Sequence, residues 1–565
     1  MPVWSHEQKY IYFRLRRFVT ESRWEMKRLP IAGTRDLIQE VLRSMEPVSK
    51  DNTALLLGEL RQRLQTNPIF ALPSLQRDRE VLLSILGKEN AEKQPETKVL
   101  ISCFFKQLNG TDLVGLHVDA LRALLAQKPF PYDDVDTVLA SLCLELIHSG
   151  YSLAFFKRSL GAAPDWTQTL PDYLLQIASQ LKQYHHRQFS IFFKMTLPSE
   201  FVDLSAIQDV EPLTEVPVDL LGCQNLEELR SFLGTGASTV RVRRQAADVL
   251  RAAEEARTEL GRLTDVFRLN RTTYDPSISD QVLVFDPLTC TCQTESVSDL
   301  PYHPIRVLVT DFFPLSTSPD LDPSSRDGVF RSLYWLRAAE SASSPESKLV
   351  AMWIATEFLF PQRKSSLDPV LEFVPSFLQL YYVPMTMGYL SQSLDFLAKK
   401  NRSNELVLKP PRTVGTGYNH DLAHHLLTQT RPILAAIEKD DILVRDVTTF
   451  CVMMNTRGAL YQMLQDYEQQ VTNDIRRIYR YRNLLVHEAA LSSQTVFRCI
   501  DRLNIFTSTV LNGILYDLRR SPRLTLQEVL TSRKEACSQY KQKLEKRAAK
   551  DIMAEAVQPP LLFSP

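Results

Sequence analysis

Hydrophobic residues recur at helical spacing through the first third of the chain. In these segments apolar side chains return every three or four positions, which is the pattern of a helix with one buried face. The clearest runs are Leu37, Ile38, Val41 and Leu42, then Leu55, Leu56, Leu60 and Leu64, and then Val135, Val138, Leu139, Leu142 and Leu146. The pattern predicts an all-helical domain over residues 1–185, and no motif in it assigns a role.

The spacing of apolar residues changes from helical to alternating near residue 186. Segment 188–195 has apolar residues at every second position, which predicts a strand with one buried face. The alternating residues are Phe189, Ile191, Phe193 and Met195. Further strands are predicted at 239–242, 282–285 and 305–309. An Ala- and Glu-rich segment predicts a helix over 246–263, so we expect a small α+β domain over 186–313.

A segment rich in Pro, Ser and Asp at 314–325 is typical of a linker between domains. Helical spacing returns after it, and the sequence Ser-Pro-Glu at 344–346 has the cap residue and first-turn proline of a helix start. Residues 326–550 are predicted to form a helical bundle, and 551–565 a loose tail. The predicted fold class is mainly α, with a helical N-terminal region, a small α+β middle domain and a C-terminal bundle.

Composition and charge narrow the classes of function. The 565 residues are 44% hydrophobic and 23% charged, which is ordinary for a globular protein and excludes a mainly disordered chain. Lys and Arg number 66, as do Asp and Glu, so a nucleic-acid contact requires a local basic face. No run of 18 apolar residues predicts a transmembrane helix, and the first residues lack a secretory pattern. We therefore expect a cytoplasmic protein that does not enter a membrane.

The eight cysteines are scattered along the chain and do not predict a disulfide framework. Most of them occur in apolar surroundings, where cysteine acts as a small hydrophobic residue. Cys290 and Cys292 have no second Cys or His pair nearby in the sequence to complete a zinc site. The sequence predicts reduced thiols and no cofactor.

One segment, 474–489, carries the candidate chemistry. On a helix at 100° per residue, four polar side chains form one stripe that spans about 60°. They are Arg476, Arg480, Asn483 and His487. Arg482 lies off the stripe, about 120° from Arg476, so only its long side chain can bring the guanidinium toward the stripe. The residues expected to face the core are Ile478, Tyr481, Leu485 and Ala489.

This stripe suits phosphodiester chemistry. Guanidinium groups hold a phosphate and neutralise charge on its oxygens, and a histidine with a pKa of about 6.5 transfers a proton at neutral pH. Asp474 and Glu488 are the nearby acids, too few for a two-metal carboxylate site. The simplest mechanism is attack of an RNA 2′-hydroxyl on its own phosphate, which DNA cannot perform. A solvated basic helix face without chemistry is the competing interpretation.

The hexamer Arg-Asn-Leu-Leu-Val-His at 482–487 resembles the motif of HEPN-domain ribonucleases, an arginine, a polar residue, three further residues and a histidine. It lies late in the predicted helical domain, as in that family. A second long apolar helix, predicted over 496–514, follows it. The resemblance covers roughly 326–520.

The chain upstream of the hexamer adds to this resemblance. The paired helical segments 330–340 and 349–360 are similar to the opening of the Apea-like branch of HEPN proteins. The second segment carries Trp353 and, four residues later, Glu357. Tyr479, just before the hexamer, is also similar to that branch.

The resemblance implies a metal-independent endoribonuclease in which Arg482, Asn483 and His487 are catalytic. The residues expected to contact RNA phosphates are Arg476, Arg480 and Tyr479. Members of the family commonly dimerise through this domain, and many are toxins or antiviral effectors in bacteria. We therefore expect an anti-phage effector that cuts RNA, with tRNA among the candidates, and that acts as a homodimer. Region 1–313 would then sense a phage-derived trigger.

Two other functions compete with a nuclease. A catalytically silent HEPN fold could bind RNA or a nucleotide and signal through dimerisation, although silent members typically lose the Arg or the His. A metal enzyme could use His420 and His424, at the spacing of two ligands, with His425 beside them. No third ligand is apparent for such a site, and Asp421 is the adjacent acid.

Two basic regions leave alternatives open. Residues 9–18 alternate aromatic and basic side chains, which suits either a grip on single-stranded RNA or a core helix with a basic outer face. Residues 474–550 contain 16 Lys and Arg against 7 Asp and Glu. This excess of positive charge either is a solvated helix face or attracts a phosphate backbone beside the candidate site.

Overall fold

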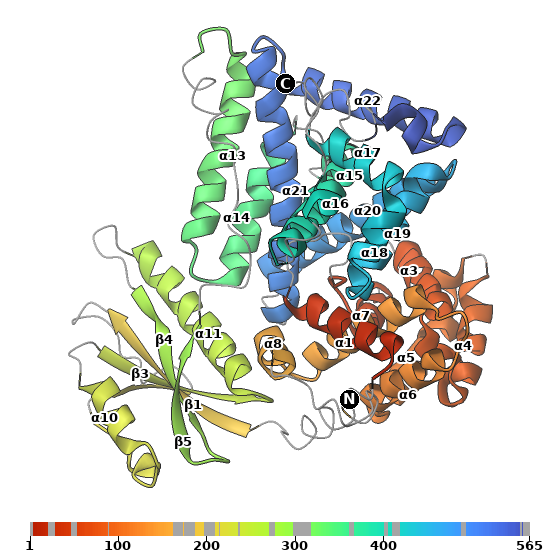
Figure 1. The fold of residues 1–565 in the computed structure, drawn as a ribbon. Coiled ribbons are helices and arrows are strands. Elements are labelled where there is room, and N and C mark those ends of the chain that lie inside the picture. Colours follow the sequence, from red (N-terminus) through yellow and green to blue (C-terminus); the bar gives the residue numbers. More distant parts are fainter. Residues whose placement is uncertain are drawn as a thin grey trace. The chain divides into compact units, whose positions relative to one another are not determined.

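The computed structural model describes residues 4–20, 29–46, 53–88, 90–161, 173, 187–196, 209–213, 215–234, 238–270, 277–297, 318–360, 367–400, 405–409, 418–487, 493–553 and 556. The chain forms two compact units, residues 1–301 and residues 302–565. It is mainly helical, with a small sheet in its middle, so the predicted fold class is confirmed (Figure 1).

The first unit begins with helices. They are α1 (His6–Thr20), α2 (Thr34–Ser44), α3 (Thr53–Thr66), α4 (Pro73–Leu86), α5 (Pro95–Gly110), α6 (Leu113–Leu125), α7 (Tyr132–His148) and α8 (Leu153–Gly161), with the 3-10 turns η2 (Pro68–Ala71) and η3 (Ala91–Lys93). All five apolar residues that predict a helix over α7 are buried. The prediction fails at Leu55, which is 38% exposed, because the buried face of α3 uses Leu57 in its place.

Helix α1 contains the segment of alternating aromatic and basic residues. Tyr10 and Tyr12 are each 1% exposed, so these rings lie in the core and cannot stack on RNA bases. Arg14 is also buried, and its Nη2 lies 2.7 Å from Oδ2 of Asp136 on α7. The structure therefore favours the core-helix interpretation of residues 9–18.

Five strands form one antiparallel sheet in the order β2-β3-β1-β4-β5. They are β1 (Arg187–Thr196), β2 (Val210–Leu213), β3 (Ser238–Ala246), β4 (Ser277–Asp286) and β5 (Thr291–Ser296). The strands predicted at 188–195, 239–242 and 282–285 lie inside β1, β3 and β4. The strand predicted at 305–309 lies outside the described residues. The sequence analysis missed β2 and β5, because one is a four-residue edge strand and the other is largely polar.

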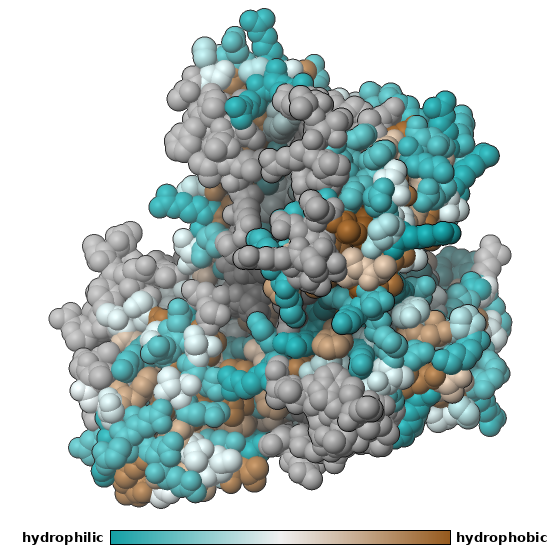
Figure 2. Space-filling model, viewed as in Figure 1, coloured by the Kyte–Doolittle hydropathy of each residue, from teal (hydrophilic) through white to brown (hydrophobic). Residues whose placement is uncertain are grey.

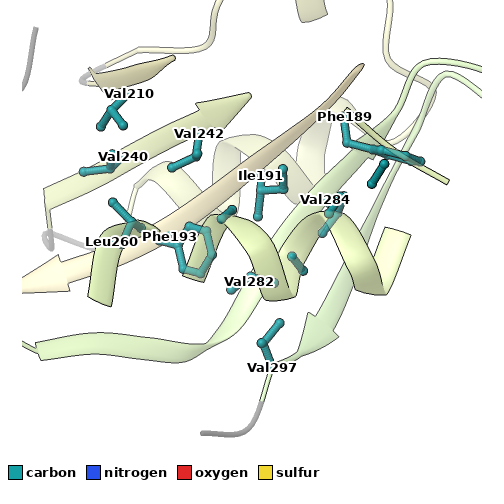
Figure 3. Packing of buried hydrophobic residues seen from close by; sticks show 14 of the residues in the cluster. Phe189, Ile191, Phe193, Val210, Val240, Val242, Leu260, Val282, Val284 and Val297 are labelled. Atoms are coloured by element: carbon teal, nitrogen blue, oxygen red, sulfur yellow. The ribbon is translucent and has the colours of Figure 1, made fainter. Parts of the chain in front are cut away.

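Both faces of the sheet are covered. On one face the four alternating residues of β1 pack with valines of β3 and β4 against α11 (Val249–Asn270). Figure 3 shows three of the four, Phe189, Ile191 and Phe193. On the other face Phe192 and Leu283 pack against Leu220 and Leu229. These come from the 3-10 turn η5 (Val218–Leu220) and from α10 (Leu226–Leu233). The sequence pattern predicted only the first of these faces.

The helices and the sheet of the first unit share contacts. Asp248 caps α11 by accepting hydrogen bonds from the backbone N–H of Arg251 and, at the start of α8, from that of Ser152, each at 2.8 Å. Burial raises the pKa of Asp248 to about 6 against the effect of these hydrogen bonds. The division of this unit into domains at residue 185 stays a prediction.

The second unit is helical. Its elements are α13 (Pro323–Ser341), α14 (Pro345–Glu357), α15 (Leu367–Lys400), α16 (Glu405–Leu408), α17 (Tyr418–Thr428), α18 (Thr430–Ala436), α19 (Asp441–Asn455), α20 (Ala459–His487), α21 (Ser493–Arg520), α22 (Leu526–Lys546) and the 3-10 turn η7 (Ala549–Ile552). The predicted linker at 314–325 runs into α13, which begins at Pro323 with Asp322 as its cap. The predicted start at 344–346 is confirmed, because the Ser344 side chain accepts a hydrogen bond from the Ser347 N–H.

Close packing holds the long helices of this unit together. Helix α14 contacts α13, α20 and α21, and α15 contacts α20, α21 and α22. A side chain at Gly513 of α21 would have its Cβ 2.8 Å from the Phe377 ring of α15, so glycine permits this close approach. The hydroxyl groups of Thr356 on α14 and Thr507 on α21 lie 2.6 Å apart.

The exterior is mixed in polarity. On the face drawn in Figure 2 hydrophilic residues predominate, and hydrophobic residues gather at the lower left, over α10. Of the helices in the described part of the chain, none combines the length and the apolar character that a membrane crossing requires.

Candidate functional site

The hexamer lies at the C-terminal end of α20, a helix of 29 residues. Gly458, with φ of +75°, precedes the helix and permits the turn from α19. The described helices that pack against α20 include α14, α15 and α21. The helix that carries the motif is therefore packed on several sides by neighbouring helices.

The two faces of α20 are oriented as the sequence predicts. Arg476, Arg480 and Asn483 are partly exposed. On the core side Ile478 is fully buried and Tyr481 is 4% exposed. Leu485, predicted to face the core, is only partly buried. Ala489, also predicted to face the core, lies outside the described residues.

The guanidinium of Arg482 lies beside the polar stripe. Its Nη1 donates a hydrogen bond to Oδ1 of Asn483 at 3.0 Å, although the two Cα atoms lie on different sides of the helix. The Nε of Arg482 is buried and has no hydrogen-bond partner. The long side chain thus brings a cationic group from the edge of the core toward the stripe, as the sequence analysis requires.

Arginines give this end of α20 a cationic character. Partial burial lowers the pKa of Arg476 from its usual value, since desolvation disfavours the charged form. The guanidinium remains protonated at neutral pH because its ordinary pKa exceeds about 12. Arg476, Arg480 and Arg482 therefore place three positive charges within two turns of helix, a suitable arrangement for a phosphate.

His487 is the last residue of α20. Its side chain lies outside the described residues, as do Glu488 and the rest of the connection to α21. Among the three residues predicted to be catalytic, the structure brings Arg482 and Asn483 into contact. The catalytic role of His487 stays a prediction.

Tyr479 packs against α14, an earlier helix of the second unit. Its ring centroid lies 5.3 Å from that of Trp353 on α14. Trp353 is fully buried, and its indole Nε1 donates a hydrogen bond to Oε1 of Glu357 one turn later. The two segments on which the family resemblance rests are therefore in direct contact, and one face of the Tyr479 ring is used for packing.

A buried ionic layer on the core side of α20 was not predicted from the sequence. Arg502 of α21 places its Nε 3.3 Å from Oδ2 of Asp474, and both side chains are less than a tenth exposed. Arg477, one turn after Asp474, is also buried. The helical projection contained a signal for this layer, because Asp474 falls on the same side of the helix as Ile478 and Tyr481.

The histidines of α17 do not converge with other ligands. Nε2 of His425 lies 2.8 Å from the carbonyl oxygen of Val407, and His424 is exposed. Among the described residues, no three or more His, Cys, Asp or Glu side chains form a cluster that could hold a metal ion. The residues therefore provide no fit for the alternative metal site.

A polar hollow in the first unit was not predicted. Its polar lining comes from Arg35, Asp36, His117, Ser141, Glu145 and His148, on helices α2, α6 and α7. Nδ1 of His117 donates to the Leu113 carbonyl at 2.6 Å, so in the neutral ring Nε2 accepts from the Ser141 hydroxyl at 2.9 Å. Burial lowers the pKa of His117 to about 4. No local motif joins these residues, so the sequence held no signal for them.

The hollow contains one ion pair and a second histidine contact in addition to His117. Arg35 and Glu145 lie 3.0 Å apart, and Nδ1 of His148 lies 3.2 Å from Oδ1 of Asp36. Such pairing is what buried charges require, and it explains the polar lining without a ligand.

Comparison of the chain with protein-family models, with curated proteins and with solved structures found no match.

Proposed function

We propose that the protein is a metal-independent endoribonuclease whose active site is the C-terminal end of α20. The observation that carries this proposal is the contact between Arg482 and Asn483, which gathers the adjacent polar residues of the hexamer beside two further arginines. A phosphate bound there would meet guanidinium groups that are partly desolvated, and electrostatic attraction is stronger in such surroundings than in water.

The reaction begins with attack of an RNA 2′-hydroxyl on the adjacent phosphorus. The new bond joins the 2′-oxygen to phosphorus, and the bond from phosphorus to the 5′-oxygen of the next nucleotide breaks. The products are a 2′,3′-cyclic phosphate and a 5′-hydroxyl. His487 transfers a proton, which leaves the 2′-hydroxyl and is replaced by one on the departing 5′-oxygen. Asn483 orients the imidazole or the substrate. Arg476, Arg480 and Arg482 neutralise the charge on the phosphate oxygens.

The biological setting of this proposal comes from the HEPN resemblance. The protein would be an effector of anti-phage defence in the bacterial cytoplasm, with RNA as substrate and tRNA among the candidates. It would act as a homodimer through its C-terminal bundle. Region 1–313 would respond to a phage-derived trigger.

A pair of arginine variants tests the site. Purified wild-type protein, Arg482→Ala and Arg523→Ala are incubated with total RNA under the same conditions. Arg523 is a matched control because its side chain is 87% exposed and it follows α21, away from the hexamer in sequence. We expect the control to cut like the wild type and Arg482→Ala to lose about 10²-fold or more in rate. Equal rates for all three proteins would contradict the proposed site, and RNA binding without cleavage would favour the silent module.

A further inference from the structure

Two cysteines that are 69 residues apart in sequence meet beneath the α10 side of the sheet. Sγ of Cys223 and Sγ of Cys292 lie 3.3 Å from each other, and both side chains are buried. Each of the eight cysteines is a free thiol, and Cys223 and Cys292 are the two whose sulfur atoms are in contact. This contact was not foreseen from the scattered positions of the cysteines.

Hydrogen bonds hold the segments that carry the two thiols next to each other. Cys223 lies between η5 and α10, and Cys292 lies on the edge strand β5. The Gln224 N–H donates to the carbonyl of Cys290 at 2.9 Å, and Nδ2 of Asn225 donates to the carbonyl of Cys292 at 3.2 Å. These two hydrogen bonds join the segments directly beside the sulfur contact. To reach a disulfide length of about 2.05 Å, the two sulfur atoms would approach each other by about 1.3 Å.

We propose that Cys223 and Cys292 are a redox pair that forms a reversible disulfide and locks η5 and α10 onto the sheet. This inference goes beyond the proposed nuclease function and does not depend on it. The oxidant is a low-molecular-weight disulfide of the glutathione class. In a reducing cytoplasm the pair is a dithiol, and the disulfide forms when the glutathione pool is oxidised.

The exchange balances in two steps. One protein thiolate attacks a sulfur of oxidised glutathione, the glutathione S–S bond breaks, and one glutathione thiolate leaves. The second protein thiolate then attacks the sulfur of the mixed disulfide and releases the other glutathione. The two protons lost by the protein thiols are taken up by the two glutathione molecules. The protein pair is oxidised by two electrons, and oxidised glutathione is reduced.

The surroundings of the pair set the conditions under which it reacts. Burial, and then the contact with Cys223, raise the pKa of the Cys292 thiol, so few thiolates exist while the segment η5–α10 is closed. Reaction therefore follows local opening of that segment, and the pair responds to sustained oxidation. Cys290, two residues before Cys292, is exposed and provides an internal comparison for accessible thiol chemistry.

The test is disulfide mapping of the folded full-length protein after incubation with oxidised glutathione. Free thiols are alkylated, the protein is digested without reductant, and the linked peptides are identified by mass. We expect a peptide that joins residues 223 and 292, absent from Cys223→Ser and from Cys292→Ser but present in Cys290→Ser. Thermal unfolding should shift upward by several degrees on oxidation of the wild type and should not shift in the two serine variants.

Several results would overturn the redox pair. One is a glutathione adduct at Cys290 while Cys223 and Cys292 remain free thiols and are alkylated. The others are a linkage that forms only in denaturant and loss of the linkage in Cys290→Ser. If a serine variant fails to fold, the mapping of the wild type decides, together with Cys223→Ala, which keeps an apolar side chain among the buried residues.

Discussion

The indole ring of Trp353 and the phenol ring of Tyr479 pack at a centroid distance of 5.3 Å, with their planes tilted by 49°. This contact joins α14 to α20 directly in front of the hexamer. Since Trp353 is fully buried and donates to Glu357, the aromatic pair fixes the position of Tyr479 from the core side. The Trp–Glu pair thus has a physical role in supporting the candidate site.

Replacing Trp353 should destabilise the second unit. Trp353→Ala removes a fully buried indole and leaves a cavity, so we expect the free energy of unfolding to fall by about 3–5 kcal/mol. Trp335→Ala on α13 is the matched control, because Trp335 is partly exposed and should cost clearly less. Urea unfolding of both variants measures the difference. Equal losses of unfolding free energy in the two variants would show that the buried Trp353 ring stabilises the unit no more than Trp335 does.

The buried ion pair between Asp474 and Arg502 gives a second stability prediction. Asp474→Asn removes the carboxylate that pairs with the buried Arg502 guanidinium, which should lower the free energy of unfolding by about 3–5 kcal/mol. Asp327→Asn removes an exposed partner of Arg331 and should change it by less than about 1 kcal/mol. Chemical denaturation compares the two variants. A neutral effect of Asp474→Asn would contradict the ionic layer.

His117 should make the first unit sensitive to acid. Its pKa is lowered from 6.5 to about 4 in the folded state, so the unfolded chain binds a proton at a higher pH than the folded chain. Stability is therefore complete above pH about 6.5 and falls as the pH falls toward about 4, by about 3 kcal/mol in total.

The variant His117→Gln isolates this effect. The amide can donate to the Leu113 carbonyl and accept from the Ser141 hydroxyl, but it does not titrate. We expect the difference in unfolding free energy between wild type and His117→Gln to change with pH between about 6.5 and 4 and to be constant above that window. Because Asp248 titrates alike in both proteins, its opposite contribution cancels in the difference. A difference independent of pH would mean that His117 is not held neutral by burial.

Periodicity predicted the elements whose signal is local. Three of the four predicted strands are present, and the fourth lies outside the described residues. Phe192 was not assigned a role, because alternation describes one face of a strand and η5 with α10 cover the other. Strand β5 was missed since its residues are mostly polar and its pairing with β4 depends on the turn between them. Contacts between distant segments, rather than local pattern, decide such elements.

The candidate site was also predictable only where its features follow from local periodicity. The exposed stripe and the buried Ile478 and Tyr481 follow from helical geometry alone. The hydrogen bond from Arg482 to Asn483 depends on a side-chain conformation, which spacing cannot specify. The partner of Asp474 comes from α21 and appears only once the helices are packed.

We expect the active unit to be a homodimer with two motif helices facing each other. Each protomer supplies one useful histidine, whereas cleavage of this kind works best with a base and an acid on opposite sides of the phosphate. An isologous two-fold interface beside His487 would supply both, at the cost of repulsion between like-charged arginines that bound RNA relieves. Dilution of the wild type should lower the mass measured by light scattering and the cleavage rate per chain together. A strict monomer that cuts RNA at full rate would rule out this arrangement.

The most direct measurement of the central claim is RNA cleavage in excess EDTA with analysis of the product ends. Attack by the 2′-hydroxyl at a site of arginines, an amide and a histidine requires no metal, so cleavage should persist and should leave cyclic or 3′-phosphate ends with 5′-hydroxyls. His487→Ala, which removes the proton-transfer group, should lose about 10²–10⁴ in rate with an unchanged melting temperature. Loss of all cleavage on chelation, restored by magnesium or manganese, would contradict the proposed mechanism.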